Sequence, residues 1–489
     1  MITLCNLPDD ILLEILTQNN LSEHDVNAFA QTNHQLHTLA NRCLYRQNAL
    51  HNRSSALVWA SETGSLETAI FALDHGSADI NIKSLKHYGG TPLMLASEKG
   101  HRAIVEFLLS KGANTNATNI FHETALSVAA QTGALDTVNI LLDHPKALPD
   151  LPDTSGQTAF WCACCNGHQA VVERLLARPD VDINRQRQDG ATPLISATGA
   201  GHTAVVQLLS ADERIDPNRC TEDAKTALMM AALHGREMIV KLLVDMPTCN
   251  VDAEDSEGKR ALSYAVRGDC VAIMQLLVDK GTDVNHQDQS GRTALSTAAD
   301  LGSESMTALL LQHGADPTLP DSKGWIPLHW AAQAGHEAVV KLLLEDDRTN
   351  PGHASLIGTT PLHCASWDGH YGVIKLLLAR DDIDVNCKDN AGWTPLIWAA
   401  FNKSVSLMQL FLDDPRTDVN AQEHQGRTAL FFAAKTRQQA VVEALLGHPM
   451  IDTTIEGQTG KNAVMYANEL GHLDMAALIE AFAKKGQYN

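Results

Sequence analysis

Apolar and polar positions alternate along this chain with a period of 33 or 34 residues. In the period that starts at Ile326, a first apolar run contains Ala331-Ala332 and is broken by Gly335-His336, and a second apolar run covers residues 339–344. Apolar residues three and four positions apart are typical of one face of a helix. The pattern therefore predicts two short helices per period, the first beginning at Pro327, whose missing N–H suits a first helical turn.

The period is marked by a three-residue slot, for which Thr91-Pro92-Leu93 is the template. The slot recurs at Thr124, Thr158, Thr192, Thr226, Arg260, Thr293, Ile326, Thr360, Thr394, Thr428 and Asn462, with a weaker copy at Ser55. Thirteen units of this length indicate stacked supersecondary structures, none of which buries its own apolar face alone.

One copy of the slot, Thr360-Pro361-Leu362-His363-Cys364-Ala365, matches the T-P-L-H-x-A signature of ankyrin repeats. Residues 52–489 resemble the ankyrin-repeat family. The resemblance implies an all-α solenoid of about thirteen repeats, each a helix-turn-helix with a projecting hairpin finger. Turns of the form Asp-x-x-Gly, such as 321–324 and 389–392, are expected to build the fingers.

Glycines punctuate the ends of the expected helices. Gly112, Gly281 and Gly314 follow second helices, where a left-handed cap is expected. Asp269, Lys403 and Arg437 instead occupy the slot at which the family has glycine after the first helix. We expect irregular helix ends in those three units.

Residues 1–48 do not follow the repeat. Leu7 to Leu16 predicts a helix with an apolar face, and a second helix is expected after Ser22. The order Leu-Pro-x-x-Ile-Leu, Leu-x-x-x-Asp-Val and Thr-Asn-x-x-Leu resembles the F-box, the helical module that binds the Skp1 adaptor of cullin-RING ubiquitin ligases. The resemblance assigns adaptor contacts to Leu7, Pro8, Ile11, Ile15 and Leu16, supported by Val26 and Phe29.

One departure and one alternative accompany the F-box resemblance. The family usually ends the motif with tryptophan, where this chain has Leu44-Tyr45-Arg46. The alternative is that these helices only cap the solenoid, which needs a polar outer face at its end. The F-box interpretation is favoured because Leu7–Leu16 carries more apolar surface than a cap requires.

Composition narrows the class of protein. The 489 residues are 44% hydrophobic and 5% aromatic, with a formal net charge of −21. This charge disfavours general binding to nucleic acid or to anionic membrane. It is consistent with a basic protein partner, although keeping a long open surface soluble is the favoured explanation. Without an 18-residue apolar run or a secretory leader, and with ten scattered cysteines, we expect a cytoplasmic or nuclear protein with reduced thiols.

Signatures of catalysis and of metal or cofactor binding are missing from the sequence. The cluster Cys162, Cys164, Cys165 and His168 lacks the paired spacing of a zinc site. Histidine returns at one slot after glycine, at His101, His168, His202, His336, His370 and His472. A position repeated by architecture predicts hydrogen bonds between units. We therefore expect no catalytic residue, no metal and no cofactor, and a chain that is not an enzyme.

Aromatic residues concentrate between positions 325 and 401. Trp325 and Trp393 precede the slot, and Trp367 and Phe401 follow the small pair of the first helix. In ankyrin repeats these positions line the binding groove, so all four are expected to contact a target protein, with Lys323, Asp368 and Lys388 as a polar rim. The alternative is that these rings fill gaps in the solenoid. Packing between helices is expected for Trp59, Trp330, Trp398 and Phe432.

Together these features predict a protein that binds other proteins. The favoured function is the substrate-recognition subunit of an SCF-type ubiquitin ligase, with a Skp1-like adaptor and a cullin complex as partners and a protein target in the ankyrin groove. A free-standing ankyrin scaffold and an enzyme with an unrecognised site are the alternatives. Co-purification of Skp1 separates the first two, and turnover without a partner would identify the third.

Overall fold

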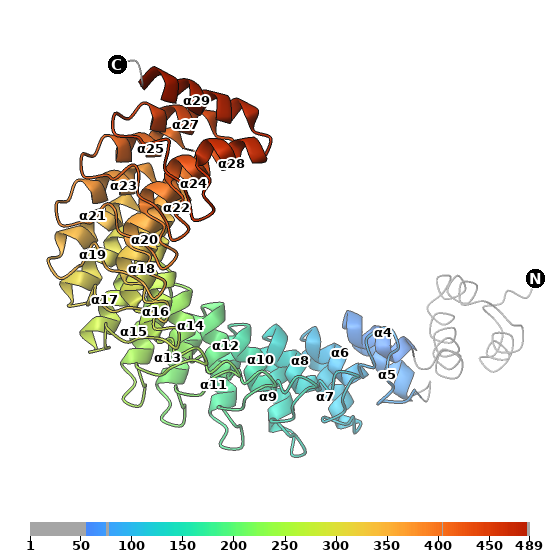
Figure 1. Cartoon of the computed structure of the whole chain (residues 1–489). Helices are drawn as coiled ribbons and strands as arrows, with labels where there is room; N and C mark the ends of the chain where they lie inside the picture. Colours follow the sequence, from blue (N-terminus) through green and yellow to red (C-terminus); the bar gives the residue numbers. More distant parts are fainter. Residues whose placement is uncertain (1–54, 75–77, 403, 487–489) are drawn as a thin grey trace, which may run out of the picture. The chain divides into compact units, whose positions relative to one another are not determined.

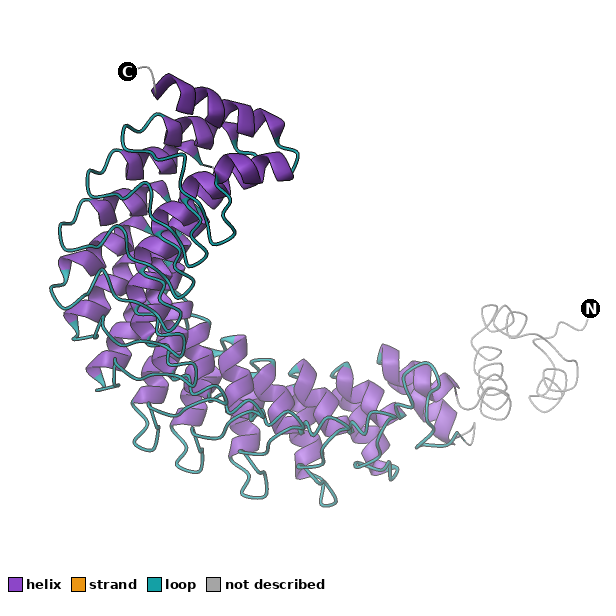
Figure 2. Ribbon diagram, viewed as in Figure 1, coloured by secondary structure: helices purple, strands orange, loops and turns teal. Residues whose placement is uncertain are grey.

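The structure is a computed structural model that describes residues 55–74, 78–402 and 404–486 as paired helices joined by loops (Figures 1 and 2). These residues form 26 helices, hence thirteen pairs, and no strand; two isolated β-bridges join Ser84 to Gly90 and Cys220 to Thr226. The expected all-α repeat fold is confirmed. The module expected at residues 1–48, with Leu7, Pro8, Ile11, Ile15, Leu16, Val26 and Phe29, lies outside the described residues.

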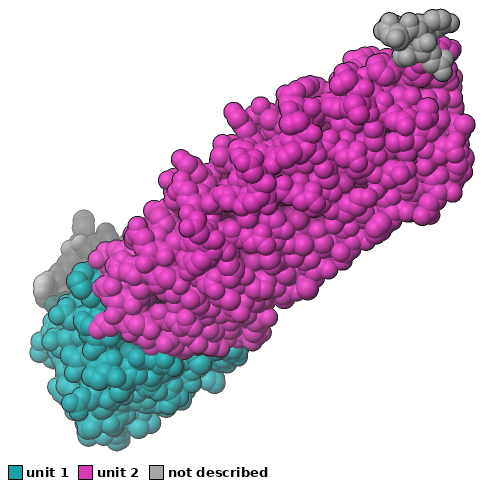
Figure 3. Space-filling view, turned by 60° about the vertical axis from the view of Figure 1, so that its left-hand side comes forward, with its two compact units in different colours: residues 1–231, 238–250 teal, residues 232–237, 251–489 magenta. Residues whose placement is uncertain are grey.

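The chain divides into two compact units (Figure 3): unit 1 is residues 1–231 and 238–250, and unit 2 is residues 232–237 and 251–489. Helices lying wholly or mostly in unit 1 are α4 Ser55–Thr63, α5 Leu66–Asp74, α6 Pro92–Glu98, α7 Arg102–Ser110, α8 Ala125–Thr132, α9 Leu135–Asp143, α10 Ala159–Cys165, α11 Gln169–Leu176, α12 Pro193–Ala200, α13 Thr203–Ser210, α14 Ala227–Leu233 and α15 Glu237–Val244. Unit 2 contains α16 Ala261–Arg267, α17 Val271–Asp279, α18 Ala294–Leu301, α19 Glu304–Gln312, α20 Pro327–Ala334, α21 Glu337–Glu345, α22 Pro361–Asp368, α23 Tyr371–Leu378, α24 Pro395–Phe401, α25 Val405–Leu412, α26 Ala429–Lys435, α27 Gln439–Leu446, α28 Ala463–Glu469 and α29 Leu473–Gly486.

The recurring threonine starts the first helix of a pair by capping it. Thr360 is extended, with φ −101° and ψ 167°, and its hydroxyl accepts a hydrogen bond from the backbone N–H of His363. Such a cap stabilises a helix by about 1 kcal/mol. Ile326 holds the same extended conformation without a side-chain cap, and Pro327 at the first helical position supplies the preset φ there.

Small residues on first helices and branched residues on second helices build the core. Ala331 and Ala332 of α20 are fully buried, which lets α18 and α22 pack on either side. In α21, Val339, Val340 and Leu343 are fully buried, whereas Leu342 and Leu344 are half-buried. Each fully buried residue of this size contributes about 1.5–3 kcal/mol. The expected apolar stripe is thus narrower than residues 339–344.

Each finger is a tight turn closed on itself and bonded to its neighbour. In the turn at 321–325, the backbone N–H of Asp321 donates to the carbonyl of Trp325 at 2.9 Å, and that of Gly324 donates to the carbonyl of Asp321 at 2.8 Å. The N–H of Leu356 in the next finger donates to the carbonyl of Lys323 at 3.0 Å. This bond helps to set the register between the two adjacent repeats.

Two of the three units that lack glycine after the first helix keep the regular turn. Asp269 and Arg437 have φ values of 50° and 56°, the left-handed conformation that Gly335 adopts at 79°. The expectation of irregular ends is wrong at these two positions, because the turn before the second helix takes this conformation in every repeat whose turn residue the structure describes. A residue with a Cβ adopts it at a cost of about 1–2 kcal/mol. Lys403 lies outside the described residues.

The recurrent histidines join neighbouring units, as expected. The Nε2 of His370 lies 2.7 Å from the carbonyl oxygen of Gln333, and that of His336 lies 3.0 Å from the carbonyl oxygen of Asp300. Equivalent bonds occur at His101, His168, His202 and, through Nδ1, His472. The last carbonyls of one first helix are thus satisfied by the next unit.

Candidate protein-binding face

The predicted target-binding residues all lie in unit 2, on the surface formed by its first helices and fingers, which we call the first-helix face. Trp367 and Phe401, at the ends of α22 and α24, are 48% and 42% exposed. Trp325 and Trp393, each the residue before the slot, are half-buried. Two of the four rings therefore face solvent, and two are partly covered by their neighbours.

The structure separates the predicted aromatic residues into two clusters. In the first, the rings of Trp325 and Trp330 meet edge to face with centroids 4.9 Å apart. The Lys323 ammonium lies over both rings, 5.4 and 5.2 Å from their centroids. The Arg292 guanidinium lies 4.0 Å from the centroid of Trp330. Cations of the chain itself thus cover this first cluster.

The second cluster joins Trp367, Phe401, Trp393, Trp398 and Phe432. Trp398 is central: its ring centroid is 4.4 Å from that of Trp367 and 4.4 Å from that of Trp393. The rings of Trp367 and Phe401 are within 11° of parallel, with centroids 6.2 Å apart. Trp393 also packs on Phe432 at 4.5 Å. The cluster spans three consecutive units and exposes one edge, formed by Trp367 and Phe401.

Packing between helices was expected for Trp330, Trp398, Phe432 and Trp59, and these four side chains differ in their burial. Phe432 is buried, whereas Trp330 and Trp398 are half-buried; Trp330 packs on the half-buried Trp325, and Trp398 packs on the exposed Trp367. Trp59 is 54% exposed, so packing was wrong there. Its helix, α4, packs against α5 and α6 and has a neighbouring described unit on one side only.

Buried carboxylates in the fingers hold two of these tryptophans through hydrogen bonds. These bonds were not predicted from the sequence. The Nε1–H of Trp330 donates to Oδ2 of Asp321 at 3.1 Å, and that of Trp398 donates to Oδ2 of Asp389 at 3.1 Å. The Tyr264 hydroxyl makes the equivalent bond to Asp255. The spacing of nine residues between an aspartate and a polar aromatic residue is the signal that could have revealed it.

The predicted polar rim is only partly available to a partner. The Lys388 ammonium donates to the carbonyl of Gln422 in the next finger at 2.8 Å, and Lys323 lies on the first cluster. Asp368 is exposed and directly follows Trp367. The rim residues therefore belong to different clusters, and Asp368 is the charged residue next to the exposed edge.

Buried histidines hold the fingers and remain neutral. Burial lowers the pKa of His329 to about 3, and it also lowers the pKa of His363. The Nε2–H of His329 donates to the carbonyl of Thr359 at 3.1 Å, and that of His363 donates to the carbonyl of Trp393 at 3.0 Å. Both side chains therefore position the backbone of the next finger beside the aromatic clusters.

Burial holds Cys162, Cys164 and Cys364 as thiols, and it raises the pKa of Cys164 well above its ordinary value. Burial raises the pKa of Cys162 and of Cys364 to about 12 in each case, which removes the thiolate needed for nucleophilic attack or metal binding. In the described ranges, no three His, Cys, Asp or Glu side chains gather as they would around a metal ion. The same ranges contain no helix with the length and apolar character needed to cross a membrane.

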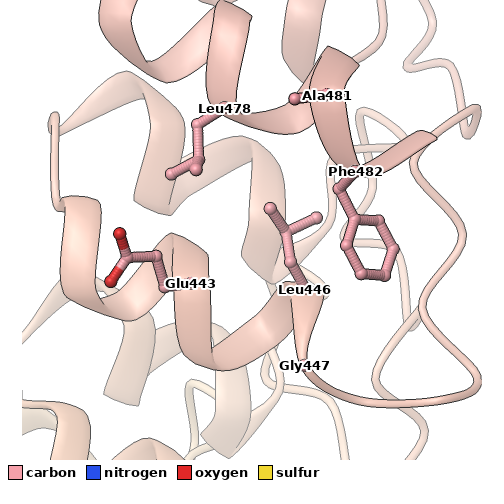
Figure 4. Close-up of a pocket in the computed structure, with 6 residues that line it drawn as sticks. All are labelled: Glu443, Leu446, Gly447, Leu478, Ala481 and Phe482. Carbon is pink, nitrogen blue, oxygen red and sulfur yellow. The ribbon is translucent and has the colours of Figure 1, made fainter. Parts of the chain in front are cut away.

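A separate apolar hollow of about 280 Å³ lies between α27 and α29 (Figure 4). Leu446 and Leu478 face each other across it, Phe482 lies beside Leu446, and Glu443 lies at the edge. It is lined mainly by carbon and offers no constellation of polar groups for chemistry.

Comparison with known proteins identifies the repeats. A family profile described as ankyrin repeats in sets of three copies matches overlapping segments that together run from residue 26 to residue 487. The chain belongs to the ankyrin-repeat family. Ankyrin repeats generally support protein–protein interaction. The first match begins within residues 1–48, the segment that the sequence assigns to a separate module.

Several curated proteins are similar to parts of this chain. The ankyrin repeat and KH domain-containing protein mask-1 of Caenorhabditis elegans is 33% identical over 140 residues, 28% of this chain and 5% of that protein. The glycerophosphocholine phosphodiesterase GDE1 of Candida albicans is 35% identical over 104 residues, 21% of this chain and 9% of that protein. The E3 ubiquitin-protein ligase XBAT33 of Arabidopsis thaliana is 32% identical over 123 residues, 25% of this chain and 23% of that protein. The chain thus spans less than a quarter of the length of each.

Proposed function

We propose that this ankyrin-repeat protein is the substrate-recognition subunit of an SCF-type ubiquitin ligase. The first-helix face of unit 2 binds the target, and the N-terminal helices bind a Skp1-like adaptor that links the chain to a cullin complex. The observation that supports target binding is the solvent-exposed edge of the second cluster, formed by Trp367 and Phe401.

An exposed pair of rings on a rigid base suits a binding hot spot. Aromatic residues dominate interface energetics because they bury a large area with few rotatable bonds. The ring of Trp398 packs edge to face against that of Trp367, and the hydrogen bond to Asp389 fixes the orientation of Trp398. A target therefore meets a surface that is ordered before it binds, which reduces the entropy lost on association.

The ligase role rests on the N-terminal sequence and on one relative. Leu7, Pro8, Ile11, Ile15 and Leu16, supported by Val26 and Phe29, match the adaptor-facing positions of the F-box. XBAT33, similar over 123 residues, is named an E3 ubiquitin-protein ligase. As a receptor the chain performs no bond chemistry, and it raises the effective concentration of a target near a ubiquitin-charged partner. This role places it in the cytoplasm or the nucleus.

Target binding is tested by alanine substitution on the first-helix face. Trp367→Ala and Phe401→Ala should each weaken capture of targets by roughly 1–3 kcal/mol, the range of interface aromatics. Trp325→Ala and Trp393→Ala test the half-buried positions. Tyr371→Ala, at an exposed aromatic of the second helix α23, is the matched control. Targets recovered equally well by Trp367→Ala, Phe401→Ala and wild type would place recognition elsewhere on the repeats.

Adaptor binding is tested separately, through the N-terminal sequence. Replacing Leu7 and Pro8 with alanine, or Ile15 with aspartate, should abolish co-purification of Skp1 and leave the melting of the repeats unchanged. Retention of Skp1 by these variants would overturn the ligase role.

A free-standing ankyrin scaffold is the second candidate, and one observation favours it. The ankyrin profile begins at residue 26, inside the segment assigned to the F-box-like module. If wild-type chain captures targets but no Skp1, the N-terminal helices belong to the repeat array and the scaffold is correct.

A further inference from the structure

On the first-helix face, a residue of one repeat places a cation over an aromatic ring of the next repeat. In two places the residue before the slot of one repeat lies against the fifth residue counted from the start of the next slot: Arg292 against Trp330, and Trp393 against Phe432. Arg292, before the slot at Thr293, covers Trp330 of the following unit at 4.0 Å. Asp300, at the end of α18, holds that guanidinium through its carboxylate at 2.8 Å. A cation, its counter-charge and a tryptophan thus form one internal set.

Of the three equivalent positions, Trp398 keeps the tryptophan and the other two are filled differently. Thr359 stands where Arg292 stands, and Trp367 stands where Asp300 stands. The ion pair of the earlier unit is replaced by a small hydroxyl and an indole. The ring of Trp398 contacts those of Trp367 and Trp393, and Phe401 stacks on Trp367. No described lysine or arginine lies over the rings of Trp367, Trp398 or Phe401.

The neighbouring rings differ in this respect. Arg292 and Lys323 cover Trp330, Lys323 also covers Trp325, and Arg427 lies 5.0 Å from the centroid of Phe432. Within the described part of unit 2, the chain supplies a cation to the aromatic rings on both sides of Trp367 and Phe401, and not to these two exposed rings. Among the described residues, the exposed edge therefore lacks the cation found over Trp325, Trp330 and Phe432 in the repeats before and after it.

We propose that a cationic side chain of a partner protein occupies the place at Trp367, Trp398 and Phe401 that Arg292 occupies at Trp330. The proposal rests on the proposed function and specifies the chemistry of the target. A cation is attracted to an aromatic face within about 6 Å of the ring centroid, most strongly by tryptophan. Because the Trp367 and Phe401 rings are nearly parallel with centroids 6.2 Å apart, one cation can lie within that range of both.

Charge around the site favours a cation over a neutral apolar group. The exposed carboxylate of Asp368 follows Trp367 directly, and the chain carries a formal net charge of −21. Both attract a basic segment during encounter and offset the desolvation of its charged head group. A lysine ammonium, a methylated lysine and an arginine guanidinium share this chemistry, so the probes must separate them.

The test uses the full chain labelled with ¹⁵N at its tryptophan indoles. The probes are four capped amino acids of similar size: acetyl-arginine amide, acetyl-lysine amide, acetyl-trimethyllysine amide and the uncharged acetyl-citrulline amide. Each is titrated while the indole N–H signal of Trp367 is followed, with assignment by Trp367→Phe. We expect saturable shifts of this signal with at least one cationic probe and no saturable shift with citrulline. The cation that gives the tightest binding identifies the side chain.

Two variants test the register argument. Thr359→Arg places a guanidinium where Arg292 lies in the earlier unit, so the site should be filled from within and binding of the cationic probe should be lost. Gln157→Arg is the control. It makes the same change before the slot at Thr158, in compact unit 1, where the residue of the next repeat that corresponds to Trp398 is Ser196. This variant should leave binding intact. Phe401→Ala should weaken binding roughly tenfold, whereas Asp368→Asn should weaken it less and remove much of its salt dependence.

The proposal is overturned if citrulline binds as tightly as the cations, if no cation shifts the Trp367 signal, or if Thr359→Arg binds the cation like wild type. These outcomes are independent of the proposed function, because the probes require neither a target protein nor Skp1. Loss of target capture in Trp367→Ala without any cation binding would support the binding face and refute the cation site.

Discussion

The indole N–H of Trp398 donates to Oδ2 of Asp389 at 3.1 Å, from the first helix of a unit to the finger of the same unit. The other carboxylate oxygen, Oδ1, accepts the backbone N–H groups of Ala391 and Trp393, each at 2.9 Å. Asp389 is only 7% exposed. One buried carboxylate therefore shapes the finger and orients two tryptophans of the second cluster. Asp321 and Trp330 repeat the arrangement two units earlier.

Removing this carboxylate should loosen the finger and the aromatic cluster together. Asp389→Ala leaves three donors without their acceptor, and we expect a loss of about 3 kcal/mol in the free energy of unfolding of this region, because an unpaired buried donor costs about 1–3 kcal/mol. Trp398→Phe removes one of these bonds and should cost less. Urea unfolding followed by tryptophan fluorescence measures both, and Asp368→Ala, at an exposed carboxylate, is the control. Equal stability of Asp389→Ala and Asp368→Ala would contradict the assignment.

Mild acid should destabilise the unit that contains His329. Burial lowers the pKa of this histidine to about 3, whereas the unfolded chain has the ordinary value near 6.5. Between these values the unfolded state binds a proton that the folded state does not, so the stability is complete above pH 6.5 and falls as the pH drops toward 3. His353, 5.6 Å away between ring centroids, and His363 have lowered pKa values and act in the same direction.

The size of the effect can be measured by substitution. From pH 7.5 to pH 5, His329 alone should cost about 2 kcal/mol, since one proton taken up on unfolding corresponds to about 1.4 kcal/mol per pH unit. His329→Gln should remove that part of the pH dependence. The rings of Trp325 and His329 are 5.8 Å apart, so tryptophan fluorescence in urea reports on this region. The same pH dependence in wild type and His329→Gln would refute the prediction.

Burial in α21 predicts a difference between two adjacent leucines. Leu343 is fully buried and Leu342 is half-buried. Leu343→Ala should therefore cost about 2–5 kcal/mol through lost contacts and a cavity, and Leu342→Ala about 1 kcal/mol. Because the stability of a repeat array is a sum of unit and neighbour terms, the loss should appear as an earlier transition of unit 2 in urea. Comparable costs for the two substitutions would show that the buried face is assigned wrongly.

Two arginines in the links that follow second helices should contribute differently to stability, although each forms the same ion pair with an aspartate. Arg416 binds Asp414 and also donates to the carbonyls of Arg380 at 2.7 Å and Leu378 at 2.5 Å in the preceding unit. Arg348 binds Asp346 in the same way, with no such carbonyl contact recorded among the described residues. We expect Arg416→Lys to cost about 1–2 kcal/mol and Arg348→Lys less than about 1 kcal/mol, because exposed pairs contribute little and lysine cannot form the forked contact. Thermal melting of the two variants provides the comparison.

The sequence by itself determined the architecture, because the information that specifies each repeat is local. A capping threonine followed by proline starts the first helix of a repeat. The end of that helix is followed by a histidine that bonds to the preceding repeat. The two helices and the turn between them follow from residues within one period, and the period itself predicts stacking. For the same reason, the repeated histidines could be recognised as structural before any contact was known.

Only the tertiary structure decided which side chains form a surface. Trp325 and Trp393 hold the same slot, yet Trp325 lies under Lys323 and beside Trp330, whereas Trp393 packs on Trp398 and Phe432. Asp269 and Arg437 keep the left-handed turn that glycine favours, because the packing of the next helix requires it. The exposure of a ring, its ring contacts and the cations near it depend on the residues of the adjoining repeats. The surroundings of Trp367 and Phe401 are therefore set by the stacking of the repeats.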